Sequence, residues 1–215
     1  IYNKTFGHHT YAAEREVQLT DVYDLASITK VAASLVSFMK LVDQGKVSID
    51  DRVSEHLLKL KFTNKKDIKF RDMLAHYAQL QAWIPFYLKT VKNGGPDSAY
   101  YRDTQSAEFP HQVAQNLFLR KDYPDSVYHI IKESNLRSKK QYKYSDLGYY
   151  FMKKVIELES KSKLEDYAAA NFYKPLGLQT MTYLPRNTIE LERIVPTEYD
   201  MLFRKQLVQG DVHDP

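Results

Sequence analysis

Residues 23–51, YDLASITKVAASLVSFMKLVDQGKVSIDD, contain the Ser-x-x-Lys pattern twice, as Ser27-Ile-Thr-Lys30 and as Ser37-Phe-Met-Lys40. In a helix, side chains three positions apart lie on the same face. Either pair can therefore place an amine beside a serine hydroxyl, and an adjacent base can activate a serine as a nucleophile. The question is which pair, if either, has that role.

The stretch itself predicts an amphipathic helix over residues 27–44. Its apolar residues follow the i, i+3, i+4 spacing of one buried helix face, at Ile28, Val31, Ala32, Leu35, Val36, Met39 and Val42. Gly45 comes next, and glycine commonly ends a helix in a left-handed conformation. The helix is thus expected to end at Gly45.

Ser27 has the better position for chemistry, because it falls at the first turn of this predicted helix. Backbone N–H groups are unpaired there and the helix dipole favours negative charge, so the N–H of Ser27 can help to stabilise an oxyanion. Ser37 lies in mid-helix, where serine usually bonds to its own backbone carbonyls. A third copy, Ser160-Lys-Ser-Lys163, stands in a charged run between predicted helices. The alternative role for Ser27 is that of an ordinary helix N-cap.

The composition is that of a soluble globular protein. The chain has 215 residues, 43% of them hydrophobic and 27% charged, which suffices for one domain with a hydrophobic core. Its net charge of +4 is scattered along the chain, which argues against nucleic acid as a partner. Cysteine is absent and no apolar run approaches the ~20 residues of a membrane span. The first residue is isoleucine and no signal peptide is visible, so we expect a piece of a longer polypeptide.

Helices are predicted to dominate the rest of the chain, and strands to be few. The first two predicted helices are a short one from about residue 50, capped by Asp50 or Asp51, and one within residues 68–80 that follows an extended entry. A short helix is predicted near Gln112–Leu119, and longer ones over Asp125–Glu133 and Ser145–Glu159. The last predicted helix begins at the capping box Ser162–Glu165 and runs to about Tyr173. Residues 1–11 predict a strand or hairpin arm, and residues 175–215 an irregular segment.

Four stretches together resemble the serine β-lactamase and penicillin-binding-protein superfamily, most closely the class C branch with its D,D-peptidases and esterases. YDLASITK with the following LVDQGKVSIDDRV is similar to the nucleophile segment, FRDMLAHYAQL to the next helix and turn, YKYSDLGYYFMKKVIE to the second motif, and FYKPLGLQTMTYLP to a later landmark. The resemblance covers nearly the whole chain in the right order. It implies an α/β (α+β) fold, namely the helix-rich portion of a β-lactamase-like domain with an incomplete antiparallel sheet, and a single partial domain over residues 1–215.

The resemblance also implies catalytic roles. Ser27 would attack a carbonyl carbon and carry the acyl group, and Lys30 would take or tune the serine proton. Tyr144 would share that proton relay. Because a free lysine has a pKa near ~10.4, Lys30 needs desolvation or a nearby positive charge to act as a base at neutral pH. Among 17 tyrosines, Tyr-x-Asp recurs at residues 101–103 and 123–125, but Tyr144 alone precedes a strongly patterned helix.

The chain departs from the family pattern in three places. Asp146, expected to bind substrate, stands where the family more often has asparagine; a carboxylate only accepts hydrogen bonds and favours a charged Lys30. The turn after His76 lacks its usual glycine, and His76 is expected to be a structural hydrogen-bonding residue. The family's third motif, Lys or His followed by x-Gly, does not occur after Tyr144. We therefore expect a fragment that is poorly active by itself.

No cofactor and no metal is implied. His8 and His9 are adjacent and would point to opposite faces of a strand, and no His-Glu-x-x-His pattern occurs. Trp83, Phe86 and Tyr87 either line a pocket or belong to the core or a surface cluster.

The leading interpretation is a serine acyl-enzyme hydrolase or transferase acting on a cell-wall peptide, a lactam or a small ester. The family resemblance places such a protein in the periplasm or cell envelope. The alternative is a non-catalytic module that keeps the fold for binding within a larger cell-wall or glycan-processing protein.

Overall fold

The computed structural model of the chain describes residues 2–213, which divide into two compact units. One is helical and consists of residues 27–85 and 124–179. The other carries the strands and consists of residues 2–26, 86–123 and 180–213. Within the described range, every helix is too short or too polar to span a bilayer.

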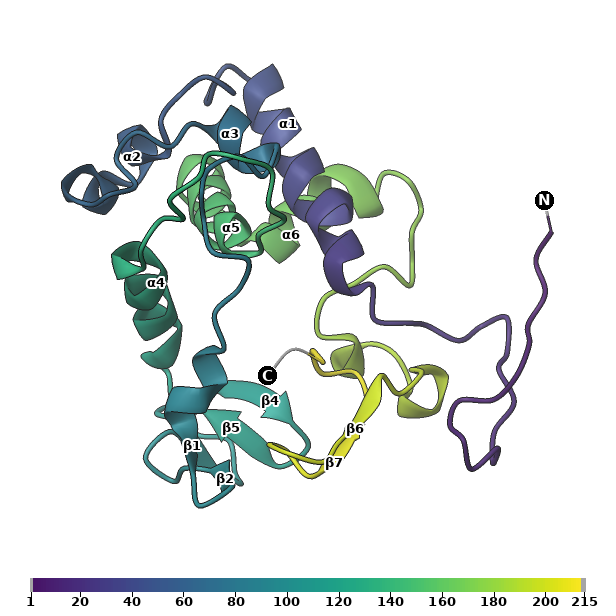
Figure 1. Cartoon of the computed structure of the whole chain (residues 1–215). Coiled ribbons are helices and arrows are strands. Elements are labelled where there is room, and N and C mark those ends of the chain that lie inside the picture. The colour runs from purple at the N-terminus through teal and green to yellow at the C-terminus, as the bar shows by residue number, and fades with distance from the viewer. Residues whose placement is uncertain (1, 214–215) are drawn as a thin grey trace. The chain divides into compact units, whose positions relative to one another are not determined.

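The helical unit is built around one long helix. This is α5 (Leu147–Ser160), which contacts α1 (Val36–Asp43), α2 (Val53–His56) and α6 (Leu164–Ala168) (Figure 1). The other helical segments of the unit are α3 (Phe70–Leu74), α4 (Tyr123–Glu133, of which Tyr123 belongs to the other unit), the 3-10 helix Leu58–Phe62 and the π-helical segments Lys30–Leu35 and Ala169–Tyr173.

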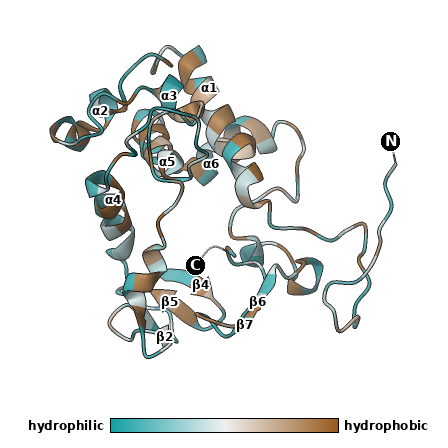
Figure 2. Cartoon of the chain, viewed as in Figure 1, coloured by the Kyte–Doolittle hydropathy of each residue, from teal (hydrophilic) through white to brown (hydrophobic). Residues whose placement is uncertain are grey.

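Apolar side chains from these helices form the core of the helical unit. Phe38 of α1 stacks against Phe70 of α3 with 4.7 Å between ring centroids, and α1 is largely hydrophobic in Figure 2. Buried residues of α5 complete the core: Leu147, Phe151, Met152, Val155 and Ile156. Gly148 allows a close approach, because a Cβ there would lie 2.5 Å from Cγ of Met73.

The strand unit contains three small antiparallel sheets. Two are hairpins, β1 (Val91–Lys92) with β2 (Gly95–Pro96) and β6 (Glu198–Asp200) with β7 (Gln206–Val208); the third has the order β3 (Tyr101–Arg102), β5 (Leu117–Leu119), β4 (His111–Ala114). The strand unit also contains the 3-10 helices Phe86–Thr90, Pro185–Asn187 and Leu191–Arg193. A further 3-10 helix, Ala26–Ile28, begins in the strand unit and ends in the helical unit.

Several predicted elements are confirmed. The helix of residues 27–44 ends as predicted: Gly45 adopts a φ of 68°, its N–H donates to the Val42 carbonyl, and the Lys46 N–H donates to the Leu41 carbonyl. This pair of bonds is a Schellman motif. The helices predicted within 68–80, over Asp125–Glu133 and over Ser145–Glu159 form with shifted ends.

Other predictions are wrong. The helix predicted near Gln112–Leu119 is the β4–β5 hairpin, with Asn116 at a φ of 54° in its turn. Residues 2–11 form no strand, since the one bridge there is His8 with Glu16; residue 1 lies outside the described part.

Both predicted caps fail as well. Helix α6 begins after Lys163, so Ser162 stands one position too early to cap it. The cap position of α2 is Arg52, so neither Asp50 nor Asp51 caps that helix.

Candidate active site

Ser27 and Lys30 lie in an irregular helix start. Ser27 belongs to the 3-10 helix Ala26–Ile28, and Lys30 opens a π-helical segment, Lys30–Leu35, that leads into α1. The expected regular helix from residue 27 is therefore corrected: it becomes α-helical only at Val36. π-helical segments are rare and frequently occur at functional sites.

The residue before Ser27 is also strained. Ala26 has a φ of 44°, in a region that costs a non-glycine residue on the order of 1–3 kcal/mol. Strain of this kind clusters at active sites.

Lys30 is the centre of the site. Its Nζ donates a hydrogen bond to Oγ of Ser27 at 2.8 Å and lies 2.6 Å from Oδ1 of Asp146. The same Nζ lies 5.3 Å from the ring centroid of Tyr144 and 5.6 Å from that of Tyr149. The ammonium group is thus surrounded by a hydroxyl, a carboxylate and two aromatic faces, all of which favour its charged form.

The electrostatic balance at Lys30 follows from these neighbours. Burial lowers the pKa of Lys30, but the Asp146 carboxylate and, to a smaller extent, the neighbouring Tyr144 hydroxyl outweigh burial and hold the pKa above its usual value. The expectation that Asp146 favours the charged lysine agrees with this direction. The opposite condition, a lysine held neutral by burial, is not the resting state of this site.

Tyr144 and Asp146 are held in place by the loop that follows α3. The Asp146 N–H donates to the Ala82 carbonyl at 2.9 Å, and Oγ of Ser145 donates to the Gln81 carbonyl at 2.6 Å. His76 of the same loop accepts a hydrogen bond from the Ser145 N–H, as expected for a structural hydrogen-bonding residue.

The other two Ser-x-x-Lys copies form no such site. Ser37 is fully buried and its Oγ has no hydrogen-bond partner in the described structure, so the predicted bond to its own backbone is absent. Oγ of Ser160 bonds to the backbone of Ser162. Of the three pairs, Ser27 with Lys30 is the one joined by a hydrogen bond within residues 2–213.

The remaining candidates are not part of this cluster. Trp83 is exposed, whereas Tyr87 packs against Phe203 in the strand unit. His9 bonds to the buried carboxylate of Asp21 in that unit. Residues 2–213 contain no group of three or more side chains placed to hold a metal ion.

Sequence reasoning missed Tyr149. It lies three positions after Asp146, at the start of α5, and its ring faces the Lys30 ammonium. Because side chains at i and i+3 share a helix face, that spacing could have identified it.

Comparison with known proteins gives the family. The Beta-lactamase family profile matches residues 1–194. The chain is 26% identical to "N-acetylmuramyl-L-alanine amidase" of Bacillus subtilis (strain 168) over 231 residues, covering 99% of this chain and 47% of the relative. It is 27% identical over 194 residues to "Putative D-alanyl-D-alanine carboxypeptidase" of Salmonella agona (strain SL483), covering 86% of this chain and 39% of the relative. The chain thus spans less than half the length of these curated relatives.

Solved structures share the fold. The octameric penicillin-binding protein homologue from Pyrococcus abyssi aligns with a TM-score of 0.64 and 19% identity over 100% of this chain and 45% of that chain. A class C β-lactamase from Rhodobacter sphaeroides aligns with a TM-score of 0.54 and 14% identity over 81% of this chain and 40% of that chain. The predicted α+β fold class is therefore confirmed. Since the profile covers most of its residues, the chain belongs to the β-lactamase family.

Proposed function

We propose that the chain carries the nucleophile half of a serine acyl-enzyme hydrolase or transferase. Ser27 is the nucleophile, Lys30 and Tyr144 form its proton relay, and Asp146 sets the charge of Lys30 and faces the substrate. The observation that carries this proposal is the 2.8 Å hydrogen bond from Nζ of Lys30 to Oγ of Ser27, within a cluster that includes Tyr144 and Asp146.

The chemistry follows from that cluster. Attack by Ser27 on a carbonyl carbon needs the Oγ proton to leave, and a lysine can accept it only as a neutral amine. In the resting site the ammonium form of Lys30 is favoured. A proton must therefore leave Lys30 before it can serve as the base, and the Asp146 carboxylate adds to the cost of that step. In this proposal Tyr144, whose ring centroid lies 5.3 Å from the same Nζ, passes protons on to the leaving group.

The substrate class that we propose is a cell-wall peptide, a lactam or a small ester. The names of the relatives, an amidase acting on N-acetylmuramyl-L-alanine and a D-alanyl-D-alanine carboxypeptidase, support a peptidoglycan-type substrate. They also support a place in the cell envelope or outside the cell. The similarity of the chain to penicillin-binding proteins supports the lactam as an acylating probe.

We further propose that the two units belong to one partial β-lactamase-like domain, because the family profile spans residues of both. That the 215-residue chain alone turns over substrates slowly stays a prediction.

The test is covalent labelling of Ser27 with a fluorescent penicillin and, separately, with a fluorophosphonate. The Ser27→Ala variant should lose labelling by both probes, whereas the matched variant Ser37→Ala should keep it. Peptide mass spectrometry of the labelled protein should place the adduct on Ser27. Equal labelling of wild type and Ser27→Ala would contradict the nucleophile assignment. Failure of both probes to label the folded wild-type protein would favour the non-catalytic binding module instead.

A further inference from the structure

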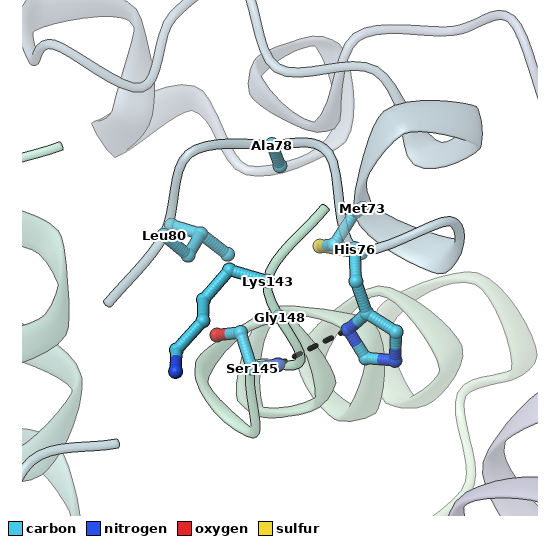
Figure 3. Close-up of a pocket in the computed structure, with 7 residues that line it drawn as sticks. All are labelled: Met73, His76, Ala78, Leu80, Lys143, Ser145 and Gly148. Atoms are coloured by element: carbon cyan, nitrogen blue, oxygen red, sulfur yellow. Dashed lines mark hydrogen bonds between the residues drawn. The ribbon is translucent and has the colours of Figure 1, made fainter. Parts of the chain in front are cut away.

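His76 makes backbone contacts on both sides of Tyr144. The Lys143 N–H donates to the His76 carbonyl at 2.9 Å, and the Ser145 N–H donates to Nδ1 of His76 at 3.1 Å. Figure 3 shows the second bond as a dashed line between the His76 ring and the backbone at Ser145. The residues on either side of Tyr144 are therefore both held by one histidine.

The His76 side chain also contacts the Tyr144 ring directly. Their ring centroids are 4.6 Å apart and the rings are tilted by 40°. His76 has a φ of 59°, a left-handed conformation in which histidine and asparagine are enriched among non-glycine residues. Since Nδ1 accepts the Ser145 N–H, the ring is neutral and carries its proton on Nε2.

We propose that neutral His76 is the positioning residue for Tyr144, and that protonation of His76 releases the Tyr144 segment from the site. This inference rests on the proposed function, because Tyr144 matters through its contact with Lys30. Protonated His76 would present an N–H at Nδ1 to the N–H of Ser145, so the bond between them would be replaced by a repulsive contact.

The groups around His76 determine the pH at which it is protonated and Tyr144 is released. They are Lys30 from the nucleophile segment, Asp146 and Tyr149 from the start of α5, and Tyr142 and Tyr144 from the preceding loop. Burial lowers the pKa of His76, the Lys30 ammonium lowers it further, and Asp146 opposes them, leaving the pKa below its usual value. Tyr144 is thus held at neutral pH, and only acid releases it.

Three substitutions of His76 separate its contacts. His76→Asn keeps an acceptor near the position of Nδ1, tolerates the positive φ and does not titrate. His76→Phe keeps an aromatic ring on Tyr144 and removes the acceptor. His76→Gly removes both without backbone strain, which guards against misfolding of the phenylalanine variant. His129→Asn, on an exposed residue of α4, is the matched control for loss of a histidine.

The first measurement is the pH dependence of Ser27 labelling by the fluorophosphonate. Protonation of Lys30 makes the rate fall with pH in every variant, so the test is a second, steeper decline below about pH 6.5, here called the acid limb. We expect wild type and His129→Asn to share this acid limb. His76→Asn should stay within about threefold of wild type at pH 7.5 and lose that acid limb. His76→Phe and His76→Gly should label about tenfold more slowly, the effect of one hydrogen bond left unmade. An unchanged acid limb in His76→Asn, or an unchanged rate in both other variants, would overturn the proposal.

The second measurement does not depend on activity. Hydrogen exchange of the Ser145 amide, followed by NMR, should be at least about tenfold more protected in wild type and His76→Asn than in His76→Phe. Equal protection in all of them would refute the role of His76. If Ser27 is not labelled in any variant while protection follows this order, the proposed function fails and the positioning contact stands.

Discussion

Replacing Asp146 with asparagine should accelerate acylation of Ser27 at neutral pH. The substitution keeps the size of the side chain and the backbone bond from the Asp146 N–H to the Ala82 carbonyl. It removes the negative charge 2.6 Å from Nζ of Lys30. Burial of Lys30, which favours the neutral amine, then meets less opposition, so the pKa of Lys30 falls and more of the protein carries a lysine that can accept the serine proton.

The size of the effect follows from the exposure of the pair. The Lys30 side chain is 17% exposed and that of Asp146 is 34% exposed, which places the pair between a surface ion pair, about 0–1 kcal/mol, and a fully buried one. A contribution of about 1–2 kcal/mol corresponds to a rate increase of about 5- to 30-fold.

The assay is the second-order rate of Ser27 labelling by a fluorophosphonate, measured from about pH 6 to about pH 11.5, because the pKa of Lys30 lies above the usual value for lysine. In wild type the rate should rise with pH over this whole range as Lys30 loses its proton. Asp146→Asn should be faster by a constant factor while Lys30 is charged in both proteins, and this factor should shrink at the alkaline end, where the lysine of the variant loses its proton first. Asp67→Asn, which removes an exposed carboxylate 3.7 Å from Arg52, is the control and should follow wild type.

Two results would refute this reasoning. The first is an Asp146→Asn variant whose rate at pH 7 equals or falls below that of wild type. The second is a rate ratio that does not shrink at the alkaline end, which would indicate a contact of the asparagine amide with the probe and not a changed charge on Lys30.

Three further predictions concern the relay and the stability of the helical unit. Tyr144→Phe should slow labelling of Ser27 by about 100-fold, the lower range for loss of a general acid or base, while the exposed Tyr11→Phe should not change it. Lys65→Met should lower the free energy of unfolding in urea by about 2–4 kcal/mol, because Nζ of the buried Lys65 donates to the carbonyls of Lys132 and Ser134, which would be left unpaired; Lys66→Met, on an exposed residue, should change little. Burial lowers the pKa of His56, but its bonds to Glu159 and Asp51 outweigh burial and raise it. The ion pairs of protonated His56 should therefore add about 1 kcal/mol to the free energy of unfolding, in full below about pH 6.5, and this contribution should disappear as the pH rises through the raised pKa. In His56→Gln the free energy of unfolding should lack this decline.

The sequence predicted best where one local pattern decides the structure. The helix over Ser145–Glu159 formed because its apolar residues recur at helical spacing and bury against α1 and α6. The end of the nucleophile helix was predictable from Gly45 alone, because only a glycine-like φ allows the two closing bonds found there.

Prediction failed where the local structure depends on pairing with another segment of the chain. The apolar residues around Leu117–Leu119 suit a helix or a strand equally, and pairing with β3 and β4 selects the strand. Residues 2–11 have strand-forming side chains, but a strand needs a neighbour to accept its backbone bonds; in the described structure they have only the bridge from His8 to Glu16. Neither the strand at Leu117–Leu119 nor the lack of one at residues 2–11 can be predicted from the local sequence.

In the candidate site, too, the local sequence predicts one part of the chemistry, and contacts with another segment determine the rest. The Ser-x-x-Lys spacing places an amine beside Ser27, and position at a helix start distinguishes this pair from Ser37 and Lys40. The spacing says nothing of the proton on Lys30, because burial and the Asp146 carboxylate act on it in opposite directions. The loop after α3 settles the balance by fixing Asp146 within 2.6 Å of Nζ. Burial lowers the pKa of Lys30, whereas the Asp146 carboxylate, held by that loop, is the first of the two groups that raise it, and Tyr144 is the second. The charge of Lys30 therefore depends on a carboxylate whose position is fixed by backbone bonds to another segment.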